Sequence, residues 1–145
     1  MSYQSSKIIF FFLLPLFLIP FQGCDDERKP FPYVYVDVTF NVSTQLNDLP
    51  VGEYVIKEGY GYGGLIIYRA QRSSFYVFDR ACTYRPNKKC LVSEDNKFGL
   101  MECPCCGSSY QLSQEGMVFN GPSTVPLKQY EAIYIPPNEL RVTNQ

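Results

Sequence analysis

Short runs of β-branched and aromatic residues recur along most of the chain, and they constrain the fold more than any other feature. Residues 33–42 alternate apolar and polar side chains almost strictly, which is typical of a strand with one buried face. No window keeps a helical apolar period over the length that a capped helix needs. Further strand-like runs, bounded by Gly, Pro, Asn or Asp, are residues 54–57, 65–69, 75–79, 99–102, 117–119, 132–135 and 140–143. The pattern predicts an all-β fold, either an antiparallel sandwich or a small barrel.

The beginning of the chain has the composition of an export signal. Residues 8–21 form an apolar run that is too short for a membrane-spanning helix and is interrupted by Pro15 and Pro20, which suits the apolar core of a signal peptide. Gly23 and Cys24 close this run, and the residues that follow are abruptly polar and acidic. A small residue before a cysteine at such a boundary resembles the cleavage box of bacterial lipoproteins.

This resemblance implies that residues 1–23 are a signal peptide and that Cys24, as the first mature residue, carries the lipid. Residues 24–32 would then tether a single domain, residues 33–145, to a bacterial membrane in the cell envelope. We expect the domain to face the periplasm or the exterior, with the outer membrane favoured because acidic residues follow Cys24. The alternative is a secreted protein that is cut nearby and whose Cys24 is free or lost.

The charge balance argues against nucleic acid as a partner. The chain has 13 Lys and Arg residues against 14 Asp and Glu residues, a formal net charge of −1, whereas phosphate binding needs a concentrated positive face. The lipid on Cys24 makes the membrane one expected partner, and an unidentified envelope protein is the other.

No group of residues in the chain has the pattern of a catalytic site. The chain contains no histidine, which excludes Ser–His and Cys–His pairs. Asp79 and Glu102 are the carboxylates beside the cysteine-rich stretches, and we expect an ion pair or solvent exposure for each. Residues 59–64 have G-x-G-x-x-G spacing, but a strand-like run follows them instead of a helix, so we interpret them as a turn. The protein is therefore expected to be no enzyme.

With Cys24 assigned to the lipid, two stretches contain four of the five remaining cysteines. The first is Cys82-Thr83-Tyr84, and the second is Cys103-Pro104-Cys105-Cys106-Gly107-Ser108. Together with Gly121-Pro122-Ser123 and Pro126-Leu127, they resemble the Rieske iron–sulfur domain over roughly residues 64–134. In that family two loops carry the ligand boxes, and a third loop, which contains proline, covers the cluster.

The resemblance implies both a fold and a cofactor. The fold would be a Rieske-like antiparallel β-sandwich or small barrel, with a loop subdomain of the kind that binds the cluster. The family's [2Fe–2S] cluster takes two thiolates on one iron and two imidazoles on the other. Carried over by position, the thiolates are Cys82 and Cys103, but the imidazole positions are occupied by Tyr84 and Cys106. The usual cluster with two histidines and two cysteines therefore cannot form.

The same resemblance implies roles for the neighbouring residues. Some members of the family brace these loops with a disulfide, and Cys90 and Cys105 would be that pair here. Ser108 and Tyr110 stand where the family tunes the cluster by hydrogen bonds. In the absence of a cluster, these two residues would satisfy the turn and fill the core.

Two states of the cysteines would bind a metal. In the first, Cys82, Cys103 and Cys106 hold a non-histidine [2Fe–2S] cluster, with Cys90 or Tyr84 as the fourth ligand. In the second, Cys82, Cys90, Cys103 and Cys106 bind zinc, for which the C-x-x-C spacing of the last two is suitable.

A third state needs no cofactor, and we favour it because both imidazoles are missing. Thiols outside the cytoplasm become oxidised, so Cys90 would pair with Cys105, and Cys82 with either Cys103 or Cys106. This state predicts a membrane-anchored binding or structural module of the envelope that lacks the cluster. The alternative function is electron transfer through a non-histidine [2Fe–2S] cluster, or a zinc site in its place. With the cluster, the protein would be at most a component of electron transfer, and its partner would be an unidentified redox protein.

Overall fold

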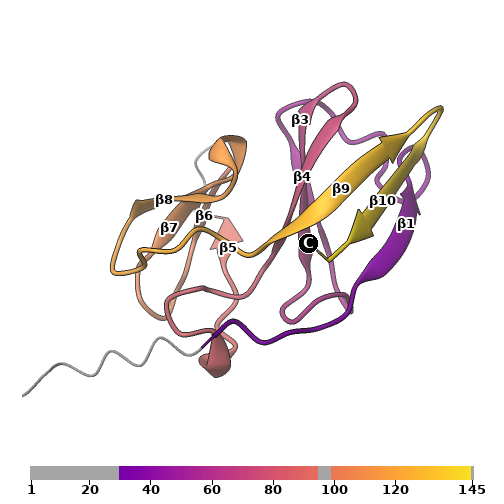
Figure 1. Ribbon diagram of the computed structural model, residues 1–145. Coiled ribbons are helices and arrows are strands. Elements are labelled where there is room, and N and C mark those ends of the chain that lie inside the picture. The colour runs from indigo at the N-terminus through magenta and orange to yellow at the C-terminus, as the bar shows by residue number, and fades with distance from the viewer. Residues whose placement is uncertain (1–29, 95–98, 145) are drawn as a thin grey trace, which may run out of the picture.

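The computed structural model describes residues 30–94 and 99–144, which form an all-β fold (Figure 1). The predictions for the signal peptide and for lipid on Cys24 concern residues outside these ranges. The strands are β1 (Asp37–Asn41), β2 (Tyr54–Lys57), β3 (Leu65–Gln71), β4 (Ser74–Asp79), β5 (Ser93–Glu94), β6 (Leu100–Glu102), β7 (Ser109–Gln111), β8 (Met117–Asn120), β9 (Gln129–Ile135) and β10 (Glu139–Thr143). Two one-turn 3₁₀ helices, η1 (Pro86–Lys88) and η2 (Leu112–Gln114), complete the described elements.

A six-stranded antiparallel sheet, in the order β1-β10-β9-β4-β3-β2, forms the larger part of the domain. Strand β3, which lies between β4 and the edge strand β2, is buried on both faces. Leu65 and Ile67 belong to one hydrophobic core, and Ile66 and Tyr68 belong to a second. Because successive side chains of a strand point to opposite faces, a strand between two cores needs an uninterrupted apolar run. The sequence of β3 therefore follows from its place between the cores.

The second core lies beneath a smaller sheet, which the chain inserts between β4 and β9. This four-stranded sheet has the order β5-β6-β7-β8 and lies beside the larger one (Figure 1). Strands β4 and β9 pair directly, with Val77 opposite Tyr130, so the insertion begins and ends at one place on the large sheet. Met101, Tyr110 and Leu112 of the insertion pack against the face of β3 and β4 that carries Ile66 and Phe78. The cysteine-rich loops belong to this insertion.

The expected all-β class is confirmed, and the strand 54–57 has the expected bounds. The first strand was predicted too long, because pairing with β10 begins only at Asp37. Before that point the backbone N–H of Val36 donates to the side chain of Asn144 at 2.6 Å, and Tyr33 and Tyr35 are exposed. Strands β5 and β7 were not predicted.

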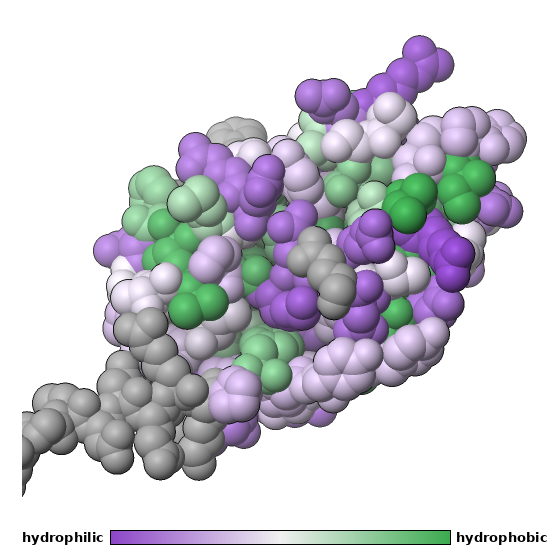
Figure 2. Space-filling model, viewed as in Figure 1, coloured by the Kyte–Doolittle hydropathy of each residue, from purple (hydrophilic) through white to green (hydrophobic). Residues whose placement is uncertain are grey.

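The surface mixes polar and apolar side chains, with apolar groups over the β8 end and over the β9–β10 hairpin (Figure 2). The exposed apolar residues there include Met117, Phe119, Ile133 and Ile135. Across residues 30–94 and 99–144, no helix has both the length and the apolar character needed to cross a membrane.

Candidate three-thiol site

Two loops of the inserted subdomain bring three thiols together. Cys82 lies on the loop that leaves β4, and Cys103 and Cys106 lie on the loop that joins β6 to β7. That second loop is a tight turn, in which the backbone N–H of Gly107 donates to the carbonyl of Cys103 at 2.8 Å. Gly107 has a φ of +73°, in the left-handed region that a side chain disfavours. The turn places Cys103 and Cys106 on the side that faces Cys82, whereas Cys105 is bonded to Cys90.

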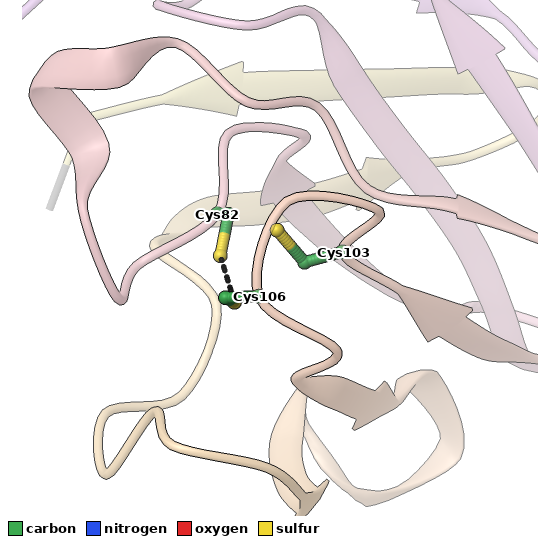
Figure 3. A group of neighbouring side chains, drawn as sticks. All are labelled: Cys82, Cys103 and Cys106. Atoms are coloured by element: carbon green, nitrogen blue, oxygen red, sulfur yellow. Dashed lines mark hydrogen bonds between the residues drawn. The ribbon is translucent and has the colours of Figure 1, made fainter.

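The three sulfur atoms form a compact group (Figure 3). They all lie within 4.8 Å of one another, and the Sγ atoms of Cys82 and Cys106 are 3.6 Å apart. Cys82 and Cys103 are buried, whereas Cys106 is partly exposed. This separation is too long for an S–S bond, and all three residues are free thiols in the structure.

A disulfide between Cys90 and Cys105 joins the two loops beside the three thiols. The first loop is also closed by its own backbone, since the N–H of Cys82 donates to the carbonyl of Cys90 at 2.8 Å. The zinc site considered from the sequence needs Cys90 as a fourth thiolate. Because Cys90 is bonded to Cys105, the structure offers three free thiols, Cys82, Cys103 and Cys106, and not four. The Sγ atom of Cys90 lies 3.6 Å from that of Cys103, so the disulfide borders the thiol group directly.

Hydroxyl groups surround the sulfurs. The Oγ atom of Ser108 lies 3.2 Å from Cys106 Sγ and accepts the backbone N–H of Ser123 at 3.0 Å. The Oη atom of Tyr110 lies 3.4 Å from Cys82 Sγ and 3.1 Å from the hydroxyl of Thr83. Thr83 in turn donates to the carbonyl of Val125 at 2.7 Å. The resemblance placed Ser108 and Tyr110 at the site, but Thr83 and Ser123 were not singled out.

The third loop, residues 121–127, covers this group through a close backbone contact. A Cβ atom at Gly121 would lie 2.4 Å from Ser108 Cα, and Gly121 has a φ of +105°. Both the space and the backbone conformation therefore require glycine at this position. The contact holds Ser123 where its N–H reaches Ser108.

Replacing Gly121 by Ala is expected to lower the free energy of unfolding by about 2 kcal/mol, because it adds a backbone clash to the strain of a left-handed conformation. Gly52→Ala is the matched control, since Gly52 has a φ of +90° but no atom within 4 Å of the added Cβ. The free energy of unfolding of this control should fall by about 1 kcal/mol, the cost of the left-handed conformation alone. Chemical denaturation measures both values. Equal losses of stability would contradict the prediction, because they would show that the loop moves away from Ser108 at no cost in free energy.

The environments of Cys103 and Cys106 shift their pKa values in opposite directions. Burial raises the pKa of the Cys103 thiol to about 12. Burial alone would also raise the pKa of Cys106, but hydrogen bonds from the Ser108 hydroxyl and backbone N–H outweigh it, so this pKa lies below its ordinary value. Burial, followed by the contact with Cys82, raises the pKa of Tyr110 to about 12, so its hydroxyl stays protonated near neutral pH.

Alkylation of the metal-free chain is therefore expected to begin at Cys106. A lowered pKa gives a larger thiolate fraction at neutral pH, and the thiolate is the reactive form. The rate of iodoacetamide labelling at Cys106 should level off at a lower pH than that of an ordinary thiol, while Cys103 stays unlabelled up to about pH 10. Peptide mapping by mass spectrometry gives both profiles. Ser108→Ala should move the Cys106 profile to higher pH, and an unmoved profile would contradict the assigned cause.

Tyr84, the other position carried over from the family, lies at the edge of the site. Its ring packs against the second core, and the Arg85 guanidinium lies 5.1 Å from the ring centroid. Tyr84 and Thr83 also line a cavity next to the thiol group. The structure thus brings Cys82, Cys103 and Cys106 together and places Tyr84 beside them.

Below the first loop, Asp79 is fully buried at the end of β4. Its carboxylate accepts the backbone N–H groups of Tyr62, Gly63 and Ala81 at 2.7 to 2.9 Å, and the hydroxyl of Tyr130 at 2.9 Å. The expectation of an ion pair or exposure for Asp79 was wrong, because backbone donors compensate its burial. Residues 59–64 form the expected turn, and the two bonds from Tyr62 and Gly63 show that this turn closes over the Asp79 carboxylate.

The arrangement of two cysteine loops and a covering third loop can be compared with known proteins. The model of the Rieske [2Fe-2S] domain family matches residues 39–131. The chain belongs to the Rieske family. The cytochrome b6-f complex iron-sulfur subunit of Chlorobaculum tepidum is 43% identical over 42 residues, which are 29% of this chain and 22% of that subunit.

The solved structures show the same Rieske fold. A chain in the complex of reduced oxygenase and oxidized ferredoxin of carbazole 1,9a-dioxygenase superposes with a TM-score of 0.51 at 22% sequence identity. The superposition covers 79% of this chain and 96% of that chain. The expected Rieske-like architecture, with its loop subdomain, is thereby confirmed.

The donor atoms of this Rieske site differ from those that the family's cluster needs. The cluster takes two imidazoles on one iron, and this chain has no histidine. The described site instead offers three thiols drawn toward one point, with hydroxyl groups around them. The residues therefore do not fit a cluster with two histidine ligands.

Proposed function

We propose that this protein is a Rieske-fold binding module of the bacterial cell envelope that works without the family's cluster. A lipid on Cys24 would hold it on a membrane, and an envelope protein would be its partner. The observation that carries the proposal is the donor set: both thiolate positions keep their cysteines, but Tyr84 and a third thiol, Cys106, stand where the family has its imidazoles. In this function the loops that present the cluster elsewhere serve as a rigid recognition surface.

The surface next to the thiols supports a role in binding. A cavity of about 720 Å³ lies between the first and third loops and has Tyr84, Met117, Val125 and Leu127 in its lining. A mostly apolar cavity of this size is typical of sites that bind a small group, and we propose that it receives apolar side chains of the partner protein. Because the Cys90–Cys105 disulfide and the Gly121 contact fix the loops on either side, little conformational entropy would be lost on binding.

A second candidate function is electron transfer through a non-histidine cluster. It is favoured by the convergence of Cys82, Cys103 and Cys106 between the two box loops. Tyr84, at the fourth family position, would complete such a ligand set. Cysteine is the ordinary ligand of iron–sulfur clusters, and a set richer in thiolate would lower the reduction potential relative to a Rieske centre.

Iron, acid-labile sulfide and visible absorption of the anaerobically purified chain separate the two functions. The binding function predicts a colourless protein without stoichiometric iron or sulfide. Stoichiometric iron and sulfide, with absorption bands that disappear in Cys106→Ser, would replace it with electron transfer. The membrane attachment is tested separately, since mass spectrometry of the mature N-terminus should find acyl chains on Cys24.

A further inference from the structure

We propose that Cys82, Cys103 and Cys106 form a site for one thiophilic metal ion of the zinc class, bound by three thiolates. The inference rests on the proposed function, because a thiol group that is free of the family's cluster is available to a single ion. Thiolates are the protein ligands that such soft or borderline ions prefer. The ion would stabilise the loops and would transfer no electrons if it is zinc.

The distances between the sulfur atoms match one ion better than two. With Zn–S bonds of about 2.3 Å and tetrahedral angles, two thiolates on one ion lie about 3.8 Å apart. The Sγ atoms of Cys82 and Cys106 are 3.6 Å apart, and all three sulfurs lie within 4.8 Å of one another. A cluster with two irons needs its ligand pairs on opposite sides of the iron–sulfide core, whereas these sulfurs converge (Figure 3).

The backbone holds the three thiols in this arrangement. Cys103 and Cys106 are the ends of a C-x-x-C turn that closes through the N–H groups of Cys106 and Gly107, which both donate to the Cys103 carbonyl. The Cys103 N–H donates to the Ser108 carbonyl at 2.8 Å, which fixes the other side of the turn. A C-x-x-C turn is a recurrent zinc-binding element, and here Cys82 approaches it from a separate loop.

Hydroxyl groups are placed to stabilise thiolate charge. As a thiol, Cys106 donates to Ser108 Oγ at 3.2 Å, and this oxygen also accepts the N–H of Ser123. Once Cys106 is a thiolate, the Ser108 hydroxyl is placed to donate its own proton to the sulfur. The Oη atom of Tyr110 lies 3.4 Å from Cys82 Sγ, and its one proton is shared between this sulfur and the Thr83 hydroxyl, which itself donates to Val125. Three thiolates on a divalent ion leave one net negative charge, and hydrogen bonds of this kind offset it and orient the ligands.

Three protein ligands leave one position of a tetrahedral ion open. Cys106 is the partly exposed member of the group, so this position is accessible from its side. Water or a small-molecule thiol would complete the coordination, as in zinc sites with three protein ligands. The disulfide keeps Cys90 from filling this position while it remains closed.

Anaerobic titration of the purified full chain with Co²⁺, after treatment with a chelator, tests the proposal. We expect one Co²⁺ per chain, with thiolate-to-cobalt absorption and the visible bands of tetrahedral cobalt, and full displacement by Zn²⁺. Each of Cys82→Ser, Cys103→Ser and Cys106→Ser should weaken binding by more than about 100-fold. The double variant Cys90→Ser with Cys105→Ser is the control and should keep the stoichiometry.

A measurement on the unmodified chain avoids variants that fail to fold. Bound Zn²⁺ should protect Cys106, the thiol that the metal-free chain exposes, from iodoacetamide near neutral pH, as mapped by mass spectrometry. This inference alone would be overturned if the folded chain, with Cys82, Cys103 and Cys106 reduced, bound neither Co²⁺ nor Zn²⁺. It would also be overturned if Cys82 and Cys106 of the purified chain were found joined as a disulfide. Stoichiometric iron and sulfide in the purified protein would overturn the proposed function as well.

Discussion

Replacing Asp79 by Asn is expected to lower the free energy of unfolding by about 3 kcal/mol. The buried carboxylate accepts three backbone N–H groups and the Tyr130 hydroxyl, so both of its oxygens are needed as acceptors. The amide turns one acceptor into a donor that faces other donors and leaves at least one buried N–H unsatisfied. Chemical denaturation monitored by tyrosine fluorescence gives the change in stability.

Glu139→Gln is the matched control for this prediction, because it makes the same chemical change at an exposed position of β10. Its effect should stay within about 0.5 kcal/mol. Tyr130→Phe removes a single bond to Asp79 and should cost about 1 kcal/mol. An Asp79→Asn variant as stable as the control would show that the carboxylate does not anchor the turn.

The Asp79→Asn replacement is also expected to affect the position of Cys82 in the thiol site. Asp79 accepts the N–H of Ala81, the residue before Cys82, and thereby fixes the start of the first loop. Burial and the neighbouring Asp79 carboxylate both raise the pKa of Tyr130, so its hydroxyl remains a donor throughout the neutral and moderately alkaline range. Loss of this anchor is expected to loosen Cys82 relative to Cys103 and Cys106.

The strands that could be predicted from the sequence are those whose alternation spans several residues. Strand β2 has the predicted bounds, and the runs at β3 and β4 are each extended by one or two residues. Strand β5 has two residues and β7 has three, which is too short for a period to be recognised. These strands form because they pair with β6 in consecutive hairpins, and this pairing is not visible in the alternation of either strand by itself.

Which residues make up the site could be predicted from the sequence better than how they are arranged in space. The resemblance named Cys82, Cys103, Cys106, Ser108 and Tyr110, and the structure gathers all five. The hydroxyl network that joins Thr83 to Ser123 connects residues 40 positions apart, so only the tertiary fold brings them into contact. The role of Asp79 was hidden for the same reason, since three of its donors, on Tyr62, Gly63 and Tyr130, lie 16 or more positions away along the chain.

The second large effect concerns the Cys90–Cys105 disulfide. Replacing both cysteines by Ser is expected to lower the free energy of unfolding by about 3 kcal/mol, because a bond across a separation of 15 residues restricts the unfolded chain. The double replacement leaves no unpaired thiol from this bond. The free energy of unfolding, measured by denaturant titration with and without reductant, tests the prediction.

Reduction of the unmodified chain provides the matched control. Reductant should lower the stability of the unmodified chain to about that of the double variant and leave the variant unchanged, since Cys82, Cys103 and Cys106 are already thiols. A variant as stable as the oxidised chain would contradict the stabilising role of the bond. A variant that reductant destabilises further would reveal a second disulfide, which could only involve Cys82, Cys103 or Cys106 within the described domain. That result would turn the three-thiol site into an oxidised pair and remove the metal ion from it.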